Sequence, residues 1–143
     1  MGHVISIITA LSLIPLFFLM RPASPLYVIE LLAILGIPFV LVSLLRHFIN
    51  APRPYELYGF YNTPPKNKRG RSFPSRHAFS AFAIGTLLCA YIPALGVIIL
   101  FLGLILCALR VLLGIHFVRD VLAGALIGII SSLIGLLIIG LGA

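Results

Sequence analysis

The sequence predicts an all-α integral membrane protein, a bundle of about five transmembrane helices with a polar active-site loop between the second and third. Composition is the first reason. Of 143 residues, 62% are hydrophobic and 9% are charged, and the mean hydropathy is +1.23. Soluble domains carry about 25% charged residues, so this chain has too few to cover a water-facing surface. The second reason is that its apolar runs reach the roughly 20 residues that a bilayer-spanning helix needs.

Five apolar segments follow one another, separated by short connectors in which proline breaks the helix. One such connector is Tyr91–Pro93. We expect the first segment to be a retained helix rather than a signal peptide, because it lacks a basic n-region. In addition, Arg21 follows the apolar run where a small-residue cleavage site would be expected. The predicted spans are His3–Met20, Leu26–Phe48, Ser75–Ile92, Ala94–Leu113 and Asp120–Leu141.

The segment 49–74 differs from the rest of the chain. Between Asn50 and Pro74 it holds five prolines, five basic residues and several tyrosines. Tyrosine suits the headgroup level of a bilayer, so these rings either rest on the membrane or contact a substrate. We interpret the segment as the active-site loop of a single membrane-embedded domain that covers residues 1–143.

The formal net charge is +7, from ten basic residues against Glu30, Glu56 and Asp120. A basic balance is typical of proteins that bind nucleic acid, anionic headgroups or an anionic substrate. The charges lie between hydrophobic spans rather than along a soluble face, which disfavours nucleic acid. Cys89 and Cys107 lie inside apolar spans without a CxxC spacing, so we interpret them as small buried hydrophobes.

Small residues recur on the later helices. Gly124, Gly128 and Ser132 are spaced by four, and Ala81 precedes Gly85 by the same interval. Such faces let helices approach closely in lipid. They could serve packing inside one chain or a homodimer, and both alternatives stay open at this point.

The polar residues converge on one membrane face if the spans alternate in direction. A charge inside a span costs about 2.5–3.5 kcal/mol even on a lenient scale. Snorkelling could relieve Arg46 or Arg110 alone, but it does not explain why cations gather from three helix ends. Guanidiniums beside a helix N-terminus suit a tetrahedral oxyanion, and Ser75 caps that helix, donates to the anion, or does both. The converging residues are Arg46, His47, Arg53, Ser75, Arg76, His77, Arg110, His116, Arg119 and Asp120.

Two histidines complete a reactive set. A neutral imidazole can attack phosphorus, and a protonated one can donate to the departing oxygen. His116 and Asp120 are one helical turn apart, so the carboxylate can hold the imidazole tautomer, which leaves His77 as the acid. A metal site on these three residues is disfavoured, because the arginines would repel a cation. We therefore expect no metal and no other cofactor.

These residues resemble the signature of the type 2 phosphatidic-acid phosphatase superfamily, which reads K-x6-R-P, then P-S-G-H, then S-R-x5-H-x3-D. The spacing and the order of all three parts match, across about half of the chain. Three residues depart from the pattern: Arg46 replaces lysine, Arg76 replaces glycine and Leu109 replaces serine. The family commonly has six membrane helices, against the five expected here. The matching residues are Arg46, Arg53 and Pro54, then Pro74, Ser75 and His77, then Arg110, His116 and Asp120.

The resemblance implies a metal-independent mechanism through a phosphohistidine. His116 would attack phosphorus with Asp120 behind it, and His77 would protonate the leaving lipid oxygen. Phosphoryl transfer needs mainly positioning and stabilisation of charge on the equatorial oxygens. The phosphate-binding residues implied are Arg46, Arg53, Ser75, the backbone of Arg76, and Arg110.

The expected function is therefore hydrolysis of a lipid phosphate or pyrophosphate at the membrane surface. Polyprenyl pyrophosphate, phosphatidylglycerol phosphate, phosphatidic acid and a lipid A phosphate all fit the same anion site. A non-catalytic lipid-phosphate-binding relative and a lipid phosphotransferase are the alternatives. The resemblance to bacterial members implies a site on the outer face of the cell membrane. The basic residues of the 49–74 loop favour the cytoplasm by the positive-inside rule.

Overall fold

The structure is a computed structural model that describes residues 2–20, 25–59 and 70–142. Every regular element in these ranges is an α-helix. The helices are α1 (Gly2–Leu11), α2 (Leu13–Met20), α3 (Pro25–Ile49), α4 (Pro54–Tyr58), α5 (Arg76–Tyr91), α6 (Pro93–Leu112) and α7 (Val118–Gly142). The predicted all-α class is confirmed, and the predicted span boundaries lie within two residues of the helix ends, except that the first span is divided.

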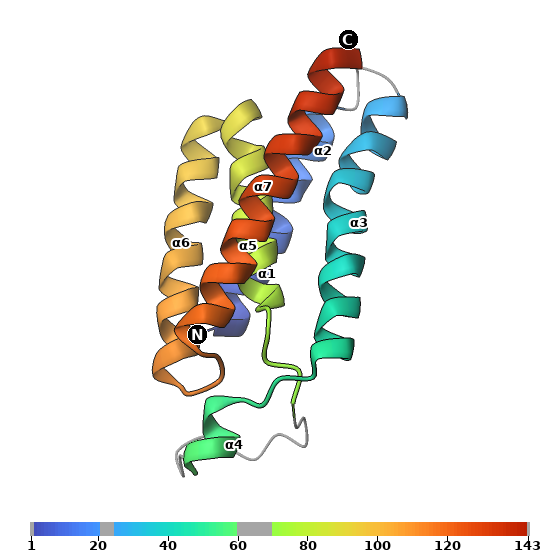
Figure 1. The fold of residues 1–143 in the computed structure, drawn as a ribbon. Coiled ribbons are helices and arrows are strands. Elements are labelled where there is room, and N and C mark those ends of the chain that lie inside the picture. The colour runs from blue at the N-terminus through green and yellow to red at the C-terminus, as the bar shows by residue number, and fades with distance from the viewer. Residues whose placement is uncertain (1, 21–24, 60–69, 143) are drawn as a thin grey trace.

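The helices form a bundle around α5 (Figure 1). Helix α7 crosses in front of α5, α6 and α3 lie on either side, and α1 and α2 lie behind. The most extensive packing joins α5 to α7 and to α6. The short helix α4 lies beyond one end of the bundle, in the connection between α3 and α5.

The first predicted span is two helices rather than one, and the break falls at Ser12. Pro15 has no N–H to donate to the carbonyl of Leu11, so the ladder loses a bond there. Two hydroxyls also bond back to the helix: Thr9 Oγ1 donates to the Ile5 carbonyl at 2.9 Å, and Ser12 Oγ to the Thr9 carbonyl at 2.7 Å. Such bonds compete with the backbone ladder and bend helices.

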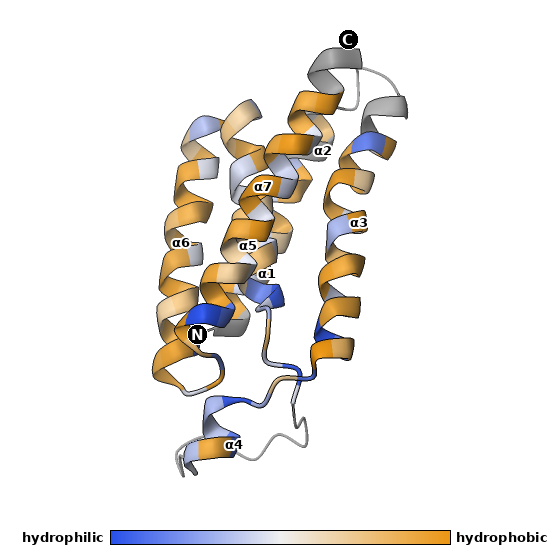
Figure 2. Ribbon diagram, in the orientation of Figure 1, coloured by the Kyte–Doolittle hydropathy of each residue, from blue (hydrophilic) through white to orange (hydrophobic). Residues whose placement is uncertain are grey.

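Three of the described segments are long and apolar enough to cross a bilayer: Ile29–Tyr58, Pro93–Leu112 and Val118–Ile138. Helix α5 has 16 residues and is shorter. Its side chains are mostly buried against other helices, so α5 faces protein rather than lipid. Figure 2 shows the helices predominantly hydrophobic along their length, as a lipid-facing bundle requires.

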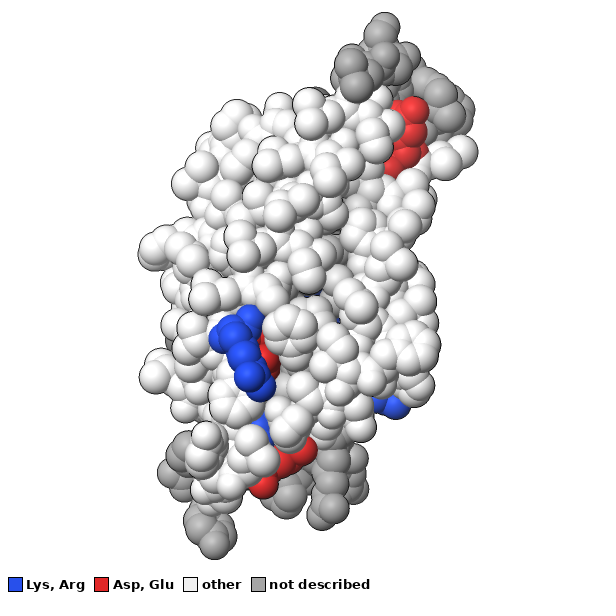
Figure 3. Space-filling model, in the orientation of Figure 1, with Lys and Arg blue, Asp and Glu red and all other residues white. Residues whose placement is uncertain are grey.

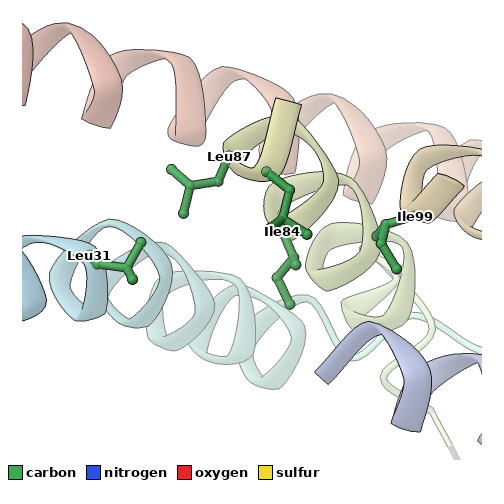
Figure 4. Close-up of a cluster of buried hydrophobic side chains, with 5 residues drawn as sticks. Leu31, Ile84, Leu87 and Ile99 are labelled. Carbon is green, nitrogen blue, oxygen red and sulfur yellow. The ribbon is translucent and has the colours of Figure 1, made fainter. Parts of the chain in front are cut away.

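Part of the core lies between α3, α5 and α6. Leu31, Ile84, Leu87, Leu88 and Ile99 form a buried cluster there (Figure 4). Many large apolar side chains of the outer helices are exposed, for example Phe101 at 62%. In water such a surface would aggregate, whereas in a bilayer it is the surface in contact with lipid.

The small-residue faces are used inside the chain. A Cβ added at Gly128 would lie 2.5 Å from the carbonyl oxygen of Phe79, and one at Gly124 would collide with the carbonyl of Ser75. Ser132 Oγ donates to the carbonyl of Ala83 at 2.9 Å. The face therefore seats α7 directly on the α5 backbone, close to the start of α5. A homodimer stays a prediction, and it would need a different surface.

Candidate active site

The polar residues of α3, α5, α6 and α7 meet at the end of the bundle where α4 lies. Figure 2 shows hydrophilic residues at the end of α3 and at the starts of α5 and α7. In the face drawn in Figure 3, the basic atoms lie toward the same end, where acidic atoms are also visible, and a further acidic patch lies near the opposite end. The polar residues therefore gather at one end of the bundle, as expected if the spans alternate in direction.

The loop between α6 and α7 places His116 above the first turn of α7. Gly114 has a φ of 64°, a left-handed conformation that glycine adopts without strain, and the His116 N–H donates to the Arg110 carbonyl at 3.2 Å. Asp120 Oδ2 accepts the N–H of Phe117 at 3.0 Å, as in one half of a capping box. The Ser75 N–H donates to the Asp120 carbonyl at 2.9 Å, which ties the start of α5 to α7.

A serine that the sequence analysis did not identify lies between the histidine and the aspartate. Ser72 is fully buried, and its hydroxyl donates to Asp120 Oδ2. The Ser72 Oγ atom also lies 3.3 Å from His116 Nδ1. His116 Nδ1 and Asp120 Oδ2 are 3.6 Å apart, beyond a direct hydrogen bond. Ser72 therefore completes the contact that spacing assigned to the His116–Asp120 pair alone.

This arrangement leaves Nε2 as the reactive nitrogen of His116, because Nδ1 faces Ser72 and Asp120. The imidazole is 2% exposed. Burial lowers the pKa of His116 below its usual 6.5, the Asp120 carboxylate opposes that shift, and the charge of Arg53 adds to it. The ring is therefore neutral at pH 7, the state in which it can act as a nucleophile.

Arg46, predicted to bind phosphate, has part of its guanidinium engaged by the backbone. Nη1 donates to the carbonyls of Pro74 at 2.5 Å and Ser72 at 3.3 Å. The side chain is 7% exposed. Arg46 therefore holds the segment that carries Ser72 and leads into α5, in addition to placing positive charge at the site.

Arg53 and Glu56 hold Gly70 at the far side of the loop. Arg53 Nε donates to the Gly70 carbonyl at 3.1 Å, and Glu56 Oε1 accepts the Gly70 N–H at 2.7 Å. Gly70 has a φ of 68°, and an added Cβ would collide with the Asn50 side chain. The glycine is thus required both by its backbone conformation and by the close approach of Asn50.

Arg110 lies in the last turn of α6, and its Nε is buried without a hydrogen-bond partner among the described residues. A buried guanidinium donor left without an acceptor is costly. A phosphate oxygen would satisfy it, which is consistent with the predicted phosphate-binding role.

Ser75, Arg76 and His77 begin α5. Ser75 is its N-cap and accepts the Ala78 N–H at 3.4 Å, so the capping role is present. His77 is half-buried and lies within electrostatic range of Arg110, His116 and Arg76. The side chain of Arg76 is exposed, and its Cζ lies 5.8 Å from the centre of the Phe39 ring.

Two of the converging residues lie at the margin. The ring of His47 is exposed and lies edge-on to that of Phe48. Arg119 Nε lies 3.6 Å from Asp120 Oδ1, with its own side chain 69% exposed. Within the described part of the chain, no three His, Cys, Asp or Glu side chains are grouped as metal ligands would be. Lys66, Lys68 and Arg69 of the loop lie outside the described residues.

Ser72 could have been found from the sequence only by its position. It precedes the Pro74–His77 motif by two residues, in a segment otherwise read as a loop. Serine in a loop is common, so residue type carried no signal. Its role depends on contacts with residues 44 and 48 positions away in the chain.

Comparisons with known proteins agree with this geometry. The profile of the PAP2 superfamily matches residues 27–140. Among solved structures, LpxE of Aquifex aeolicus is 31% identical, with a TM-score of 0.75 over 94% of this chain and 82% of that one. A transmembrane PAP2-type phosphatidylglycerolphosphate phosphatase of Bacillus subtilis is 26% identical, with a TM-score of 0.61 over 94% of this chain and 74% of that one. Comparison with curated protein sequences found no match. The match over residues 27–140 shows that this chain belongs to the PAP2 superfamily, and it has the fold of that family's membrane phosphatases.

Proposed function

We propose that the protein hydrolyses a phosphomonoester or pyrophosphate of a membrane lipid through a phosphohistidine on His116. The observation that carries the proposal is the buried, neutral His116, whose Nδ1 faces Ser72 and Asp120, together with the buried Arg110 Nε that has no hydrogen-bond partner among the described residues. A nucleophile fixed in one tautomer and a guanidinium donor free to bind a phosphate oxygen are what phosphoryl transfer requires.

The first half-reaction transfers the phosphoryl group to the protein. His116 Nε2 forms a bond to phosphorus as the bond between phosphorus and the lipid oxygen breaks. Protonated His77 gives its proton to that oxygen, so the lipid leaves as an alcohol or, from a pyrophosphate, as a monophosphate. The guanidiniums of Arg53 and Arg110 stabilise the charge on the equatorial oxygens.

Water completes the cycle. His77, now neutral, accepts a proton from a water molecule, whose oxygen attacks phosphorus as the bond to His116 breaks. Inorganic phosphate leaves, and both histidines return to their starting states. The arginines supply the positive charge that a metal ion provides in many phosphatases, so the proposed reaction needs no metal.

The substrate class is a lipid because the site lies at the end of a bundle whose outer surface faces the bilayer. Polyprenyl pyrophosphate, phosphatidylglycerol phosphate, phosphatidic acid and a lipid A phosphate remain the candidates. The similarity to a phosphatidylglycerolphosphate phosphatase supports a glycerophospholipid among them.

The test is phosphate release from a detergent-solubilised lipid phosphate in the presence of EDTA. The wild-type protein is expected to be active, and His116→Ala inactive. His47→Ala is the matched control, because His47 is an exposed histidine in the last turn of α3 whose ring packs against Phe48. Full activity of His116→Ala would overturn the proposal, and a strict magnesium requirement would overturn the metal-free mechanism.

A second measurement addresses the intermediate. With labelled p-nitrophenyl phosphate, whose acidic leaving group does not need the His77 proton, His77→Ala is expected to retain acid-labile, base-stable label on the protein, because the water step lacks its base. Absence of label in that variant, together with normal turnover, would contradict the phosphohistidine.

We also propose that the site faces the outside of the cell, a proposal that the likeness to bacterial family members supports. Cysteines introduced at Tyr58 and Ala94 lie at opposite ends of the bundle. In a background lacking Cys89 and Cys107, a membrane-impermeant maleimide added to intact cells is expected to label the cysteine at position 58. Labelling at position 94 alone would show that the site faces the cytoplasm and would contradict this proposal.

A further inference from the structure

A cavity of about 360 Å³ begins at His77 and runs between the helices toward the membrane interior. Arg76 and His77 line its polar end together with Ser6 of α1. Leu13 and Ile84 line its apolar part. The cavity therefore joins a charged end to a hydrocarbon-like interior, as a pocket for part of a lipid would.

The cavity lies on the leaving-group side of the proposed reaction. In an in-line displacement, the departing oxygen lies opposite the attacking nitrogen of His116. His77 protonates that oxygen, and His77 also lines the cavity. The part of the lipid beyond the scissile bond is therefore directed into this space, past Arg76.

Arg76 is available to bind an anion there. It stands where the family signature has glycine, so its side chain is not part of the common phosphate site. Its guanidinium lies over the Phe39 ring and forms no ion pair with a carboxylate of the described residues. Glu56 is bonded to Gly70, and Asp120 lies beside His116 and Arg119.

The charge at this end exceeds what one phosphate can balance. The described residues there include six arginines and two carboxylates, which leaves four positive charges before either histidine is protonated. A phosphomonoester carries about two negative charges at most. A second anionic group would use the remaining excess. The arginines are Arg46, Arg53, Arg71, Arg76, Arg110 and Arg119, and the carboxylates are Glu56 and Asp120.

We propose that Arg76 binds a second phosphate on the leaving-group side of the scissile bond, and so selects lipids whose leaving group is itself anionic. This inference rests on the proposed function. The second phosphate could be the phosphodiester of a glycerophospholipid headgroup or the inner phosphate of a prenyl pyrophosphate. Both present the same chemistry to the guanidinium, and bidentate binding by arginine suits either.

The experiment compares two substrates that share their tails. Dioleoyl phosphatidylglycerol phosphate carries a second phosphate, whereas dioleoyl phosphatidic acid carries only the one to be cleaved. Arg76→Gln is expected to lower kcat/KM about 10- to 100-fold for the first substrate and less than about threefold for the second. Arg76→Lys keeps the charge but not the bidentate geometry of the guanidinium. Its kcat/KM for the first substrate should lie between those of the wild type and Arg76→Gln. The ratio of the two kcat/KM values within one preparation does not depend on the folded fraction.

A farnesyl pair distinguishes the two sources of the second phosphate. If the inner phosphate of a pyrophosphate is the ligand, Arg76→Gln lowers turnover of farnesyl diphosphate selectively against farnesyl monophosphate. Selective loss in either pair supports the inference and identifies the source.

Arg71→Gln is the control, because it removes the same charge from the same end without lining the cavity. It is expected to change both members of a pair by the same factor. Equal loss on all substrates with Arg76→Gln, or no loss on any, would overturn this inference while leaving the phosphatase intact. A wild-type protein that releases phosphate from none of the four lipids, and from no lipid A phosphate, would overturn the proposed function, and this inference with it.

Discussion

Ser72 Oγ lies between His116 and Asp120, donating to Asp120 Oδ2 and lying 3.3 Å from His116 Nδ1. The three side chains come from the segment before α5, the α6–α7 loop and the first turn of α7. All three are buried, with 2% exposure for His116 and none for the other two. In such surroundings a hydroxyl that joins a carboxylate to an imidazole orients both.

Ser72→Ala is therefore expected to lower kcat about 3- to 30-fold with little change in KM, because the serine positions His116 without touching substrate. Removing its bond to Asp120 leaves more of the carboxylate charge for His116, so the acidic limb of the kcat/KM profile should move to higher pH. Ser43→Ala is the control, since Ser43 is half-buried and its hydroxyl donates to the Phe39 carbonyl within α3. An unchanged kcat and pH profile in Ser72→Ala would contradict a role of Ser72 in positioning His116.

The pH dependence of the wild-type protein follows from burial of His116. Its pKa is lowered from 6.5, chiefly by burial, so the imidazole stays neutral until the pH falls below that value. Protonation at lower pH blocks the attacking nitrogen. The acidic limb of kcat/KM for a lipid phosphate should therefore be centred below pH 6.5, with activity rising as the pH increases through it.

Asp120→Asn provides the matched variant for this limb. The Asp120 carboxylate raises the pKa of His116, so its removal should move the acidic limb further down in pH while lowering kcat. A limb that moves upward in Asp120→Asn would contradict the assignment to His116.

Substitutions of Arg46 and Arg110 are expected to have different effects on the stability of the protein. Arg46→Gln removes the donor to the Ser72 and Pro74 carbonyls, so both thermal stability in detergent and activity should fall. Arg110→Gln removes a buried Nε that has no partner among the described residues, so activity should fall about 10- to 100-fold without loss of stability. Thermal unfolding and phosphate release on the same preparations check both. Equal destabilisation by the two substitutions would mean that Arg110 is also structural.

The close packing of α7 on α5 makes a prediction for Gly128. Its added Cβ would lie 2.5 Å from the Phe79 carbonyl oxygen, so Gly128→Ala should destabilise the protein by about 1–3 kcal/mol. Gly36→Ala is the control, because its Cβ would meet nothing within 4 Å and alanine favours a helix. Unfolding of the two variants in detergent is the measurement, and equal stability would contradict the packing.

Much of the fold could be predicted because it depends on local properties of each segment. Apolar length and proline positions placed α3, α5, α6 and α7 within two residues of their observed ends. The division at Ser12 was not predicted, because total hydropathy does not register the missing bond at Pro15. The spacing of His116 and Asp120 within one turn likewise brought them to one side of α7.

The remaining details depend on contacts between segments far apart in the chain. Hydropathy and motif spacing identified the arginines and histidines, because charge inside a membrane protein is costly and therefore conspicuous. Hydropathy and spacing could not show that Ser72 joins His116 to Asp120, that Arg46 donates hydrogen bonds to backbone carbonyls, or that Arg76 lies over Phe39. Each of these relationships is decided when α3, α5 and α7 pack together, since only then do side chains from different helices come within hydrogen-bonding or ring-contact distance.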